Sequence, residues 1–133
     1  MIAKIQESEI HPSDFPEKAS YDIGSSVTFE GIVRRDEGGK ELSFLLYEAE
    51  RDLAERELMN ILEEAKQKYH FEDAIAVHRI GKLAPGERSL FVRVFSEHRK
   101  EGFEGCIYIV DELKRRLPIW KKDIYNDGSE KWH

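Results

Sequence analysis

Residues 50–69 read ERDLAERELMNILEEAKQKY and place apolar side chains at the spacing of one helical face. Acidic side chains come early in this stretch, and two lysines, Lys66 and Lys68, come late, an order that the helix dipole favours. We therefore predict an amphipathic helix, and the strand-like segments on both sides of it set the fold class. The side chains expected on its apolar face are Leu53, Ala54, Leu58, Ile61, Leu62, Ala65 and Tyr69.

Two segments before this helix alternate between apolar and polar residues as strands do, VTFEGIVR at 27–34 and ELSFLLYEA at 41–49. The stretch RDEGGK at 35–40 predicts a turn between them, so we expect the two strands to pair antiparallel. Its GGK triplet is no P-loop, because that motif needs a longer glycine-rich run that ends in GK[ST]. After the helix, AIAVHRI at 74–80 and SLFVRVF at 89–95 predict two more strands.

A second helix is predicted from about residue 99 to residue 117, because Pro118 disfavours helical geometry at the residue before it. Gly102 and Gly105 lie inside this helix, where each costs about 0.5–1 kcal/mol relative to alanine. The resulting element order, β-β-α-β-β-α-β, predicts a single α+β domain over residues 1–133. The expected apolar stripe of the second helix is Phe103, Cys106, Ile107, Val110, Leu113 and Leu117.

Composition excludes several classes of protein. The 133 residues carry a net charge of −6, which disfavours a protein that coats nucleic acid. No window approaches 18 consecutive apolar residues, and the N-terminus lacks the apolar core of a signal peptide, so we expect a cytoplasmic protein without a membrane span. The single cysteine, Cys106, has no partner for an intramolecular disulfide, which suits a reducing compartment. Positive charge is concentrated in residues 93–122, a pattern that can mark an anion site, although a solvated helix face is the commoner explanation.

The segment SEHRKEGF at 96–103 places His98 and Arg99 where a predicted strand meets a predicted helix. Free backbone N–H groups and the positive end of the helix dipole favour an anion at such a junction, and Arg99 could bind it through two hydrogen bonds. The alternative is a solvated first helical turn without a ligand.

The segment LKRRLPIWKK at 113–122 places two lysines around a rigid corner. Lys114 follows the apolar stripe of the helix, and Lys121 follows Pro118 and the aromatic Trp120. A lysine can hold an anion or act in acid, base or nucleophilic chemistry. The alternative is a basic helix end that complements the dipole.

Other reactive residues give weaker signals. His78, His98 and His133 lack the close spacing of a zinc site, so we expect no bound metal. Cys106 falls on the apolar stripe, which favours an inert thiol over a nucleophile. The nucleophile motif GxSxG is absent.

Five motifs in this order and spacing resemble the large, catalytic subunits of molybdopterin synthase, the MoaE family, over about residues 24–132. They are VTFEGIVR, LLYEAE, AVHRIGKLAPGE, SEHRKEGF and DELKRRLPIWKK. The resemblance implies an α/β hammerhead fold with antiparallel strands and two main helices. It also implies a homodimer that binds a small ubiquitin-like, MoaD-like subunit at each end, a heterotetramer in all, without a bound cofactor. The thiocarboxylate at the Gly-Gly terminus of the small subunit would donate sulfur to cyclic pyranopterin monophosphate.

The resemblance also implies roles for particular residues. The catalytic lysine of the family falls on Lys114, and Lys121 would assist by charge or proton transfer. The substrate-binding positions fall on Ile32, Val33, Arg34, His98, Arg99, Lys114, Lys121, Lys122 and Asp123. Asp123 departs from the glutamate that the family usually carries there.

One alternative function remains open at this point. The same basic segment could belong to a noncatalytic module that binds phosphate, a nucleotide or RNA. The predicted elements include neither an RNP-like aromatic strand nor a KH-type GXXG loop, which weakens the RNA interpretation.

Overall fold

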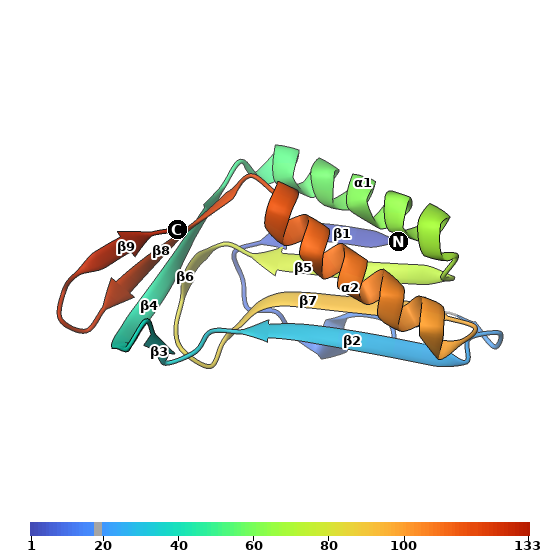
Figure 1. Ribbon diagram of the computed structural model, residues 1–133, viewed down its shortest axis with the longest axis horizontal. Helices are drawn as coiled ribbons and strands as arrows, with labels where there is room; N and C mark the ends of the chain where they lie inside the picture. Colours follow the sequence, from blue (N-terminus) through green and yellow to red (C-terminus); the bar gives the residue numbers. More distant parts are fainter. Residues whose placement is uncertain (18–19) are drawn as a thin grey trace.

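The computed structural model describes residues 1–17 and 20–133, which form two sheets and two long helices (Figure 1). The first sheet has the strand order β1-β5-β7-β2, and the second has the order β3-β4-β8-β9, with β6 also paired to β4. The strands of the first sheet are β1 (Ile2–Gln6), β2 (Ser25–Ile32), β5 (Asp73–Arg79) and β7 (Arg88–Ser96). Those of the second are β3 (Asp36–Glu37), β4 (Lys40–Ala49), β6 (Gly81–Leu83), β8 (Ile119–Tyr125) and β9 (Glu130–Trp132).

Helices α1 (Arg51–Tyr69) and α2 (Arg99–Arg116) lie side by side on one face of the first sheet (Figure 1). Both helices were predicted to within a residue or two. Their buried side chains and the inner face of the sheet form the main core, in which Leu58, Ile61 and Ile109 have no exposed surface. The opposite face of the sheet is covered by the N-terminal segment, where Phe15 stacks on Phe91 with ring centroids 5.5 Å apart. No helix among the described residues is long and apolar enough to cross a membrane.

The buried face of α2 differs from the predicted stripe. The structure buries Gly102, Gly105, Cys106, Ile109 and Leu113, whereas Phe103 and Ile107 are 55% and 61% exposed. The two glycines cause this difference, because they let the helix approach the sheet closely on their own side. A Cβ added at Gly102 would lie 2.7 Å from the Ser96 hydroxyl. In α1 the stripe holds except at Leu53, which is half-exposed.

Replacing Gly105 by alanine is therefore expected to destabilise the protein. A Cβ at this position would lie 2.7 Å from Cδ2 of Phe71, whose ring is buried in the core. We expect this overpacking, which typically costs about 1–3 kcal/mol, to outweigh the gain in helix propensity of about 0.5–1 kcal/mol. Urea unfolding measures the net loss, with the exposed Glu104→Ala on the same helix as the control. An unchanged or higher free energy of unfolding for Gly105→Ala would contradict the prediction.

The predicted pairing of the strands at 27–34 and 41–49 is wrong. β2 pairs antiparallel with β7 instead, with a register shift between Gly31 and Ile32. Beyond Ile32 the chain leaves the first sheet, and β4 pairs with β8, β6 and β3 in the second sheet. The physical reason is long-range, because the apolar side chains of β4 are buried against strands from much later in the chain. This small core consists of Val33, Leu42, Leu45, Leu83 and Tyr125.

The Gly-rich turn does form a hairpin, but within the second sheet. Gly38 and Gly39 both have positive φ, at 62° and 81°, between the short strand β3 and β4. Two consecutive positive φ angles suit a tight hairpin of the type I′ class. Strands β1, β3, β6 and β9 were not predicted from the sequence. Of these, β1 pairs with β5 in the parallel sense, whereas antiparallel strands were expected.

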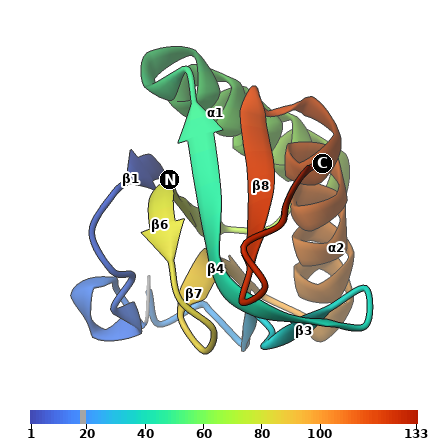
Figure 2. The ribbon, with the colours of Figure 1, turned by 90° about the vertical axis from the view of Figure 1, so that its left-hand side faces the viewer.

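The second sheet stands at the end of the first, and β8 leads into it directly from α2 (Figure 2). Pro118 ends the helix, and the Ile119 N–H donates to the carbonyl of Leu117 at 2.8 Å as the chain turns. The C-terminal end of α2 and the start of β8 are thereby held close together, at the corner between the two sheets.

Candidate functional site

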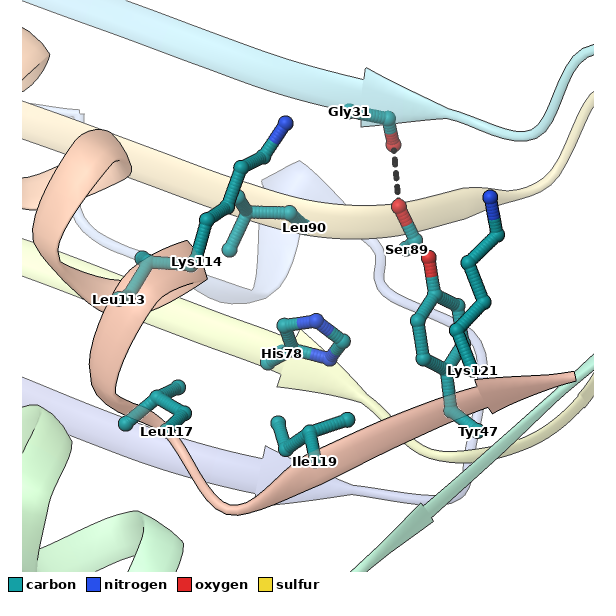
Figure 3. A pocket seen from close by; sticks show the side chains of 10 residues that line it. All are labelled: Gly31, Tyr47, His78, Ser89, Leu90, Leu113, Lys114, Leu117, Ile119 and Lys121. Atoms are coloured by element: carbon teal, nitrogen blue, oxygen red, sulfur yellow. Dashed lines mark hydrogen bonds between the residues drawn. The ribbon is translucent and has the colours of Figure 1, made fainter. Parts of the chain in front are cut away.

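A cavity of about 280 Å³ lies at this corner, between the end of α2, the start of β8 and the first sheet. Figure 3 shows Lys114 and Lys121 on two sides of the cavity, with His78 and Tyr47 between them. The residues that line it are Gly31, Tyr47, His78, Ser89, Leu90, Leu113, Lys114, Leu117, Ile119 and Lys121. The structure thus brings together the two lysines that the sequence singled out.

Lys114 lies in the last turn of α2, next to the buried Leu113. The end of this helix is held by Arg116, which pairs with Glu57 and, at 2.6 Å, with Glu64 on α1. Both ion pairs include charge-assisted hydrogen bonds to the same guanidinium. They therefore hold the end of the helix more firmly than a single surface ion pair would. Lys114 therefore projects into the cavity from a rigid support.

Lys121 and Lys122 point in opposite directions because successive side chains of a strand alternate between its two faces. Lys121 lines the cavity, whereas Lys122 forms an ion pair with Glu130 at 2.7 Å and lies over the Trp132 ring. Of the two neighbours in the sequence motif, only Lys121 is thus available to a ligand in this cavity.

Asp123 lies beneath Lys121 and is completely buried. Its Oδ2 accepts a hydrogen bond from the Tyr125 hydroxyl at 3.2 Å and lies 2.5 Å from Nε2 of His133. Its Oδ1 lies 3.7 Å from Nζ of Lys121. Among the described residues, Oδ1 of Asp123 is the only buried side-chain N or O atom without a hydrogen-bond partner. Asp123 is therefore placed as a counter-ion for Lys121, and its side chain does not line the cavity.

His78 and Tyr47 line the cavity, although the sequence analysis assigned neither of them to it. The rings meet edge to face, with centroids 5.0 Å apart. Burial, with the positive charge of Lys114 as a smaller cause, lowers the pKa of His78 to about 4, and burial raises the pKa of Tyr47. A histidine that directly follows the apolar run AIAV in AIAVHRI was the available signal, because a buried polar side chain in a strand needs a reason.

The buried His78 predicts a loss of stability in mild acid. Its pKa is about 4 in the fold against 6.5 in the unfolded chain, so between these values the unfolded chain binds the additional proton. The free energy of unfolding therefore falls as the pH drops from 6.5 towards 4, and His78 alone accounts for about 2–3 kcal/mol by about pH 4.5. Urea unfolding near pH 7 and near pH 4.5 measures the fall. His78→Gln should show a smaller fall than the wild-type protein, and an equal fall in both would contradict this assignment.

His98 and Arg99 do not reach this cavity in the same chain. They lie at the start of α2, where Glu101 accepts a hydrogen bond from the His98 backbone N–H at 2.8 Å. With a rise of 1.5 Å per residue, the 15 residues from Arg99 to Lys114 separate their backbones by about 22 Å. One small ligand cannot contact both ends of the helix.

The remaining predicted positions lie near the exit of β2. Ile32 is half-exposed, and Val33 is buried in the small core of the second sheet. Arg34 follows them with an exposed side chain that pairs with Glu37 at 3.2 Å. These residues border the cavity wall at Gly31, although none of them lines it.

Comparison with known proteins finds relatives along nearly the whole chain. The family described as MoaE protein matches residues 5–116. The molybdopterin synthase catalytic subunit of Thermoplasma volcanium is 43% identical over 131 residues, or 98% of this chain and 96% of that protein.

Solved structures agree with this match. Molybdopterin synthase from Staphylococcus aureus has a TM-score of 0.93 and 32% identity, over 98% of this chain and 96% of the other. A complex of subunits 1 and 2 of molybdopterin-converting factor from Helicobacter pylori shares the fold, with a TM-score of 0.79 at 19% identity over 97% and 88% of the two chains. These similarities favour the enzyme over the noncatalytic binding module.

Proposed function

This chain belongs to the MoaE protein family, and from that membership we propose that it catalyses sulfur transfer as the catalytic subunit of a molybdopterin synthase. The substrate is cyclic pyranopterin monophosphate, which two sulfur transfers convert into the dithiolene of molybdopterin. The sulfur arrives as the C-terminal thiocarboxylate of a small ubiquitin-like subunit. The observation that carries the proposal is the cavity that combines Lys114 and Lys121 in a chain of this family.

The chemistry of transfer suits two lysines. The thiocarboxylate sulfur forms a bond to a substrate carbon while a C–O bond of that carbon breaks, and the departing oxygen takes up a proton. The product is a thioester, and water then attacks the carbonyl carbon of this thioester. The tail leaves as a carboxylate, and the sulfur stays on the substrate. Negative charge develops on the carbonyl oxygen during the attack, where Lys114 stabilises it. Lys121, beside the buried Asp123, supplies a second positive charge and a path for a proton.

Cys106 is not the source of sulfur in this scheme. Its side chain is 5% exposed, and burial raises the pKa of its thiol to about 11, so the thiolate is scarce at neutral pH. The sulfur therefore has to arrive from outside the chain. A single buried thiol also supports a cytoplasmic location, since cytosolic proteins rarely rely on disulfides.

In this proposal His98 and Arg99 bind the phosphate of the substrate. In the same chain, however, they lie about 22 Å from Lys114. A second copy of the chain resolves this distance if its α2 lies antiparallel to the first. The start of the second α2 then faces the end of the first, and His98 and Arg99 of one copy meet Lys114 of the other. A twofold axis creates two such sites at once.

The outer face of α2 supports a homodimer of this kind. Phe103, Ile107, Val110 and Lys114 recur at intervals of three or four residues and so share one face. The contacts of Tyr108 with Glu64 and Tyr69 of α1 lie on the other side of the helix. α2 packs against β2, which is an edge strand of the first sheet. The exposed Phe103 and Ile107 give a second copy apolar surface to bury.

The small subunit is the third component of the proposal. The Helicobacter pylori complex joins two subunits of molybdopterin-converting factor on the same fold. We propose that this chain likewise binds a MoaD-like partner, and that the partner's Gly-Gly tail enters the cavity between Lys114 and Lys121. A tail without side chains suits a cavity of about 280 Å³ that must also admit the substrate.

Reconstitution tests the function. The purified chain is mixed with thiocarboxylated small subunit and cyclic pyranopterin monophosphate, and the pterin product is analysed by mass spectrometry. We expect a product that has gained two sulfur atoms, and none when the small subunit ends in an ordinary carboxylate. Failure to form this product, with every component folded, would contradict the proposal.

A further inference from the structure

His78 is the one cavity residue whose protonation can be deduced from its partner. Its Nδ1 lies 2.8 Å from the carbonyl oxygen of Arg79. A carbonyl oxygen only accepts hydrogen bonds, so Nδ1 carries a hydrogen and donates it. The side chain is 8% exposed, and burial keeps the ring neutral above about pH 4. A neutral imidazole with its hydrogen on Nδ1 has an unprotonated Nε2.

This Nε2 is a hydrogen-bond acceptor, whereas the two lysines of the cavity can only donate hydrogen bonds. The described residues make no hydrogen bond to it, while the Tyr47 ring packs against the imidazole edge to face. Lys114 and Lys121 are pure donors, and the Ser89 hydroxyl donates to the Gly31 carbonyl at 3.3 Å. A nearly buried acceptor therefore faces a cavity whose charged groups are all donors.

We propose that Nε2 of His78 accepts a hydrogen bond from an N–H or O–H group of the ligand, so that His78 is a substrate-binding residue. The two lysines bind the anionic part of the ligand, and His78 binds a neutral, hydrogen-bearing part. The lone pair of Nε2 would repel a phosphate oxygen, so the phosphate is directed away from His78. The proposal deepens the proposed function, on which it rests for the identity of the ligand.

The first experiment reads the tautomer without any activity. Nitrogen-15 NMR of the wild-type protein between about pH 8 and about pH 5 distinguishes a protonated from an unprotonated ring nitrogen. We expect the Nε2 resonance of His78 at the unprotonated position throughout this range. A hydrogen on Nε2 in the free protein would overturn the proposal.

The second experiment reads the contact in the same spectra. Cyclic pyranopterin monophosphate should shift the Nε2 resonance of His78 in the direction of a hydrogen-bonded acceptor, and inorganic phosphate alone should leave it in place. An unchanged resonance at saturating substrate, or an equal shift with phosphate, would overturn the proposal. Because this readout needs no turnover, it stays decisive even if the sulfur-transfer assay fails.

Variants test the energetic consequence of the contact. His78→Leu removes the acceptor, whereas His78→Gln keeps an acceptor oxygen in a similar volume. We expect KM for the pterin substrate to rise about 10- to 100-fold in His78→Leu, with a smaller change in kcat, and to recover largely in His78→Gln. Equal KM values for the wild type and His78→Leu would contradict the role, and the NMR titration decides it if His78→Leu fails to fold.

Discussion

Replacing Lys114 by alanine is expected to lower the rate of sulfur transfer by about 10²–10³-fold, the usual loss when one donor to a developing oxyanion is removed. Lys114 is the cavity lysine that α2 holds rigidly, because Arg116 ties the end of that helix to Glu64 of α1. The backbone of Lys114 therefore does not have to be ordered before its ammonium stabilises the charge. Single-turnover measurement of the pterin product gives the rate of transfer directly.

The matched control is Arg115→Ala, one residue further along the same helix. Arg115 is exposed and does not line the cavity, and Glu112, at 2.5 Å, is its only ion-pair partner among the described residues. Its loss should leave the rate within about twofold, since exposed ion pairs contribute little. A folded Lys114→Ala variant with full activity would remove Lys114 from the mechanism.

Two inactive variants are expected to restore each other if the site is shared between two copies. Lys114→Ala and Arg99→Ala each damage every site of their own homodimer. After the chains are mixed and exchanged, half of the dimers contain one copy of each variant, and one of their two sites has both residues intact. About one quarter of the wild-type activity should therefore return. The measurement is the activity of the mixture against that of each variant alone.

A second pair of variants provides the control for this experiment. Lys114 and Lys121 line the same cavity of one chain, so mixing Lys114→Ala with Lys121→Ala leaves every site lacking one lysine. This mixture should stay inactive. Recovery in the control pair, or no recovery when Lys114→Ala is mixed with Arg99→Ala, would contradict a site built from two copies.

The sequence predicted those elements whose signals are local. Helix α1 was predicted from its apolar spacing and α2 from the break at Pro118, and strands β5 and β7 followed from their apolar runs. It failed where distant parts of the chain decide. β2 alternates in the same way whether its neighbour is β4 or β7, so the pattern could not select the partner.

The prediction of which side chains of α2 are buried failed for a similar reason. Phe103 and Ile107 are apolar at helical spacing, and only the close approach permitted by Gly102 and Gly105 rotates them out of the core. The same rotation leaves Phe103 and Ile107 available to a second copy. An apolar stripe predicts which side chains are buried, but it does not predict whether the surface that covers them belongs to the same chain or to a second copy.

The sequence by itself determined the chemistry of the site, because ammonium, guanidinium and imidazole groups are properties of residues such as Lys114, Lys121, Arg99 and His98. Tertiary structure alone decided which of them meet. Pro118 and the turn into β8 bring the two lysines to one cavity, while the length of α2 carries Arg99 about 22 Å away. Burial then converted His78 from an ordinary strand residue into a neutral acceptor, since the cost of desolvating its charged form depends on everything packed around it.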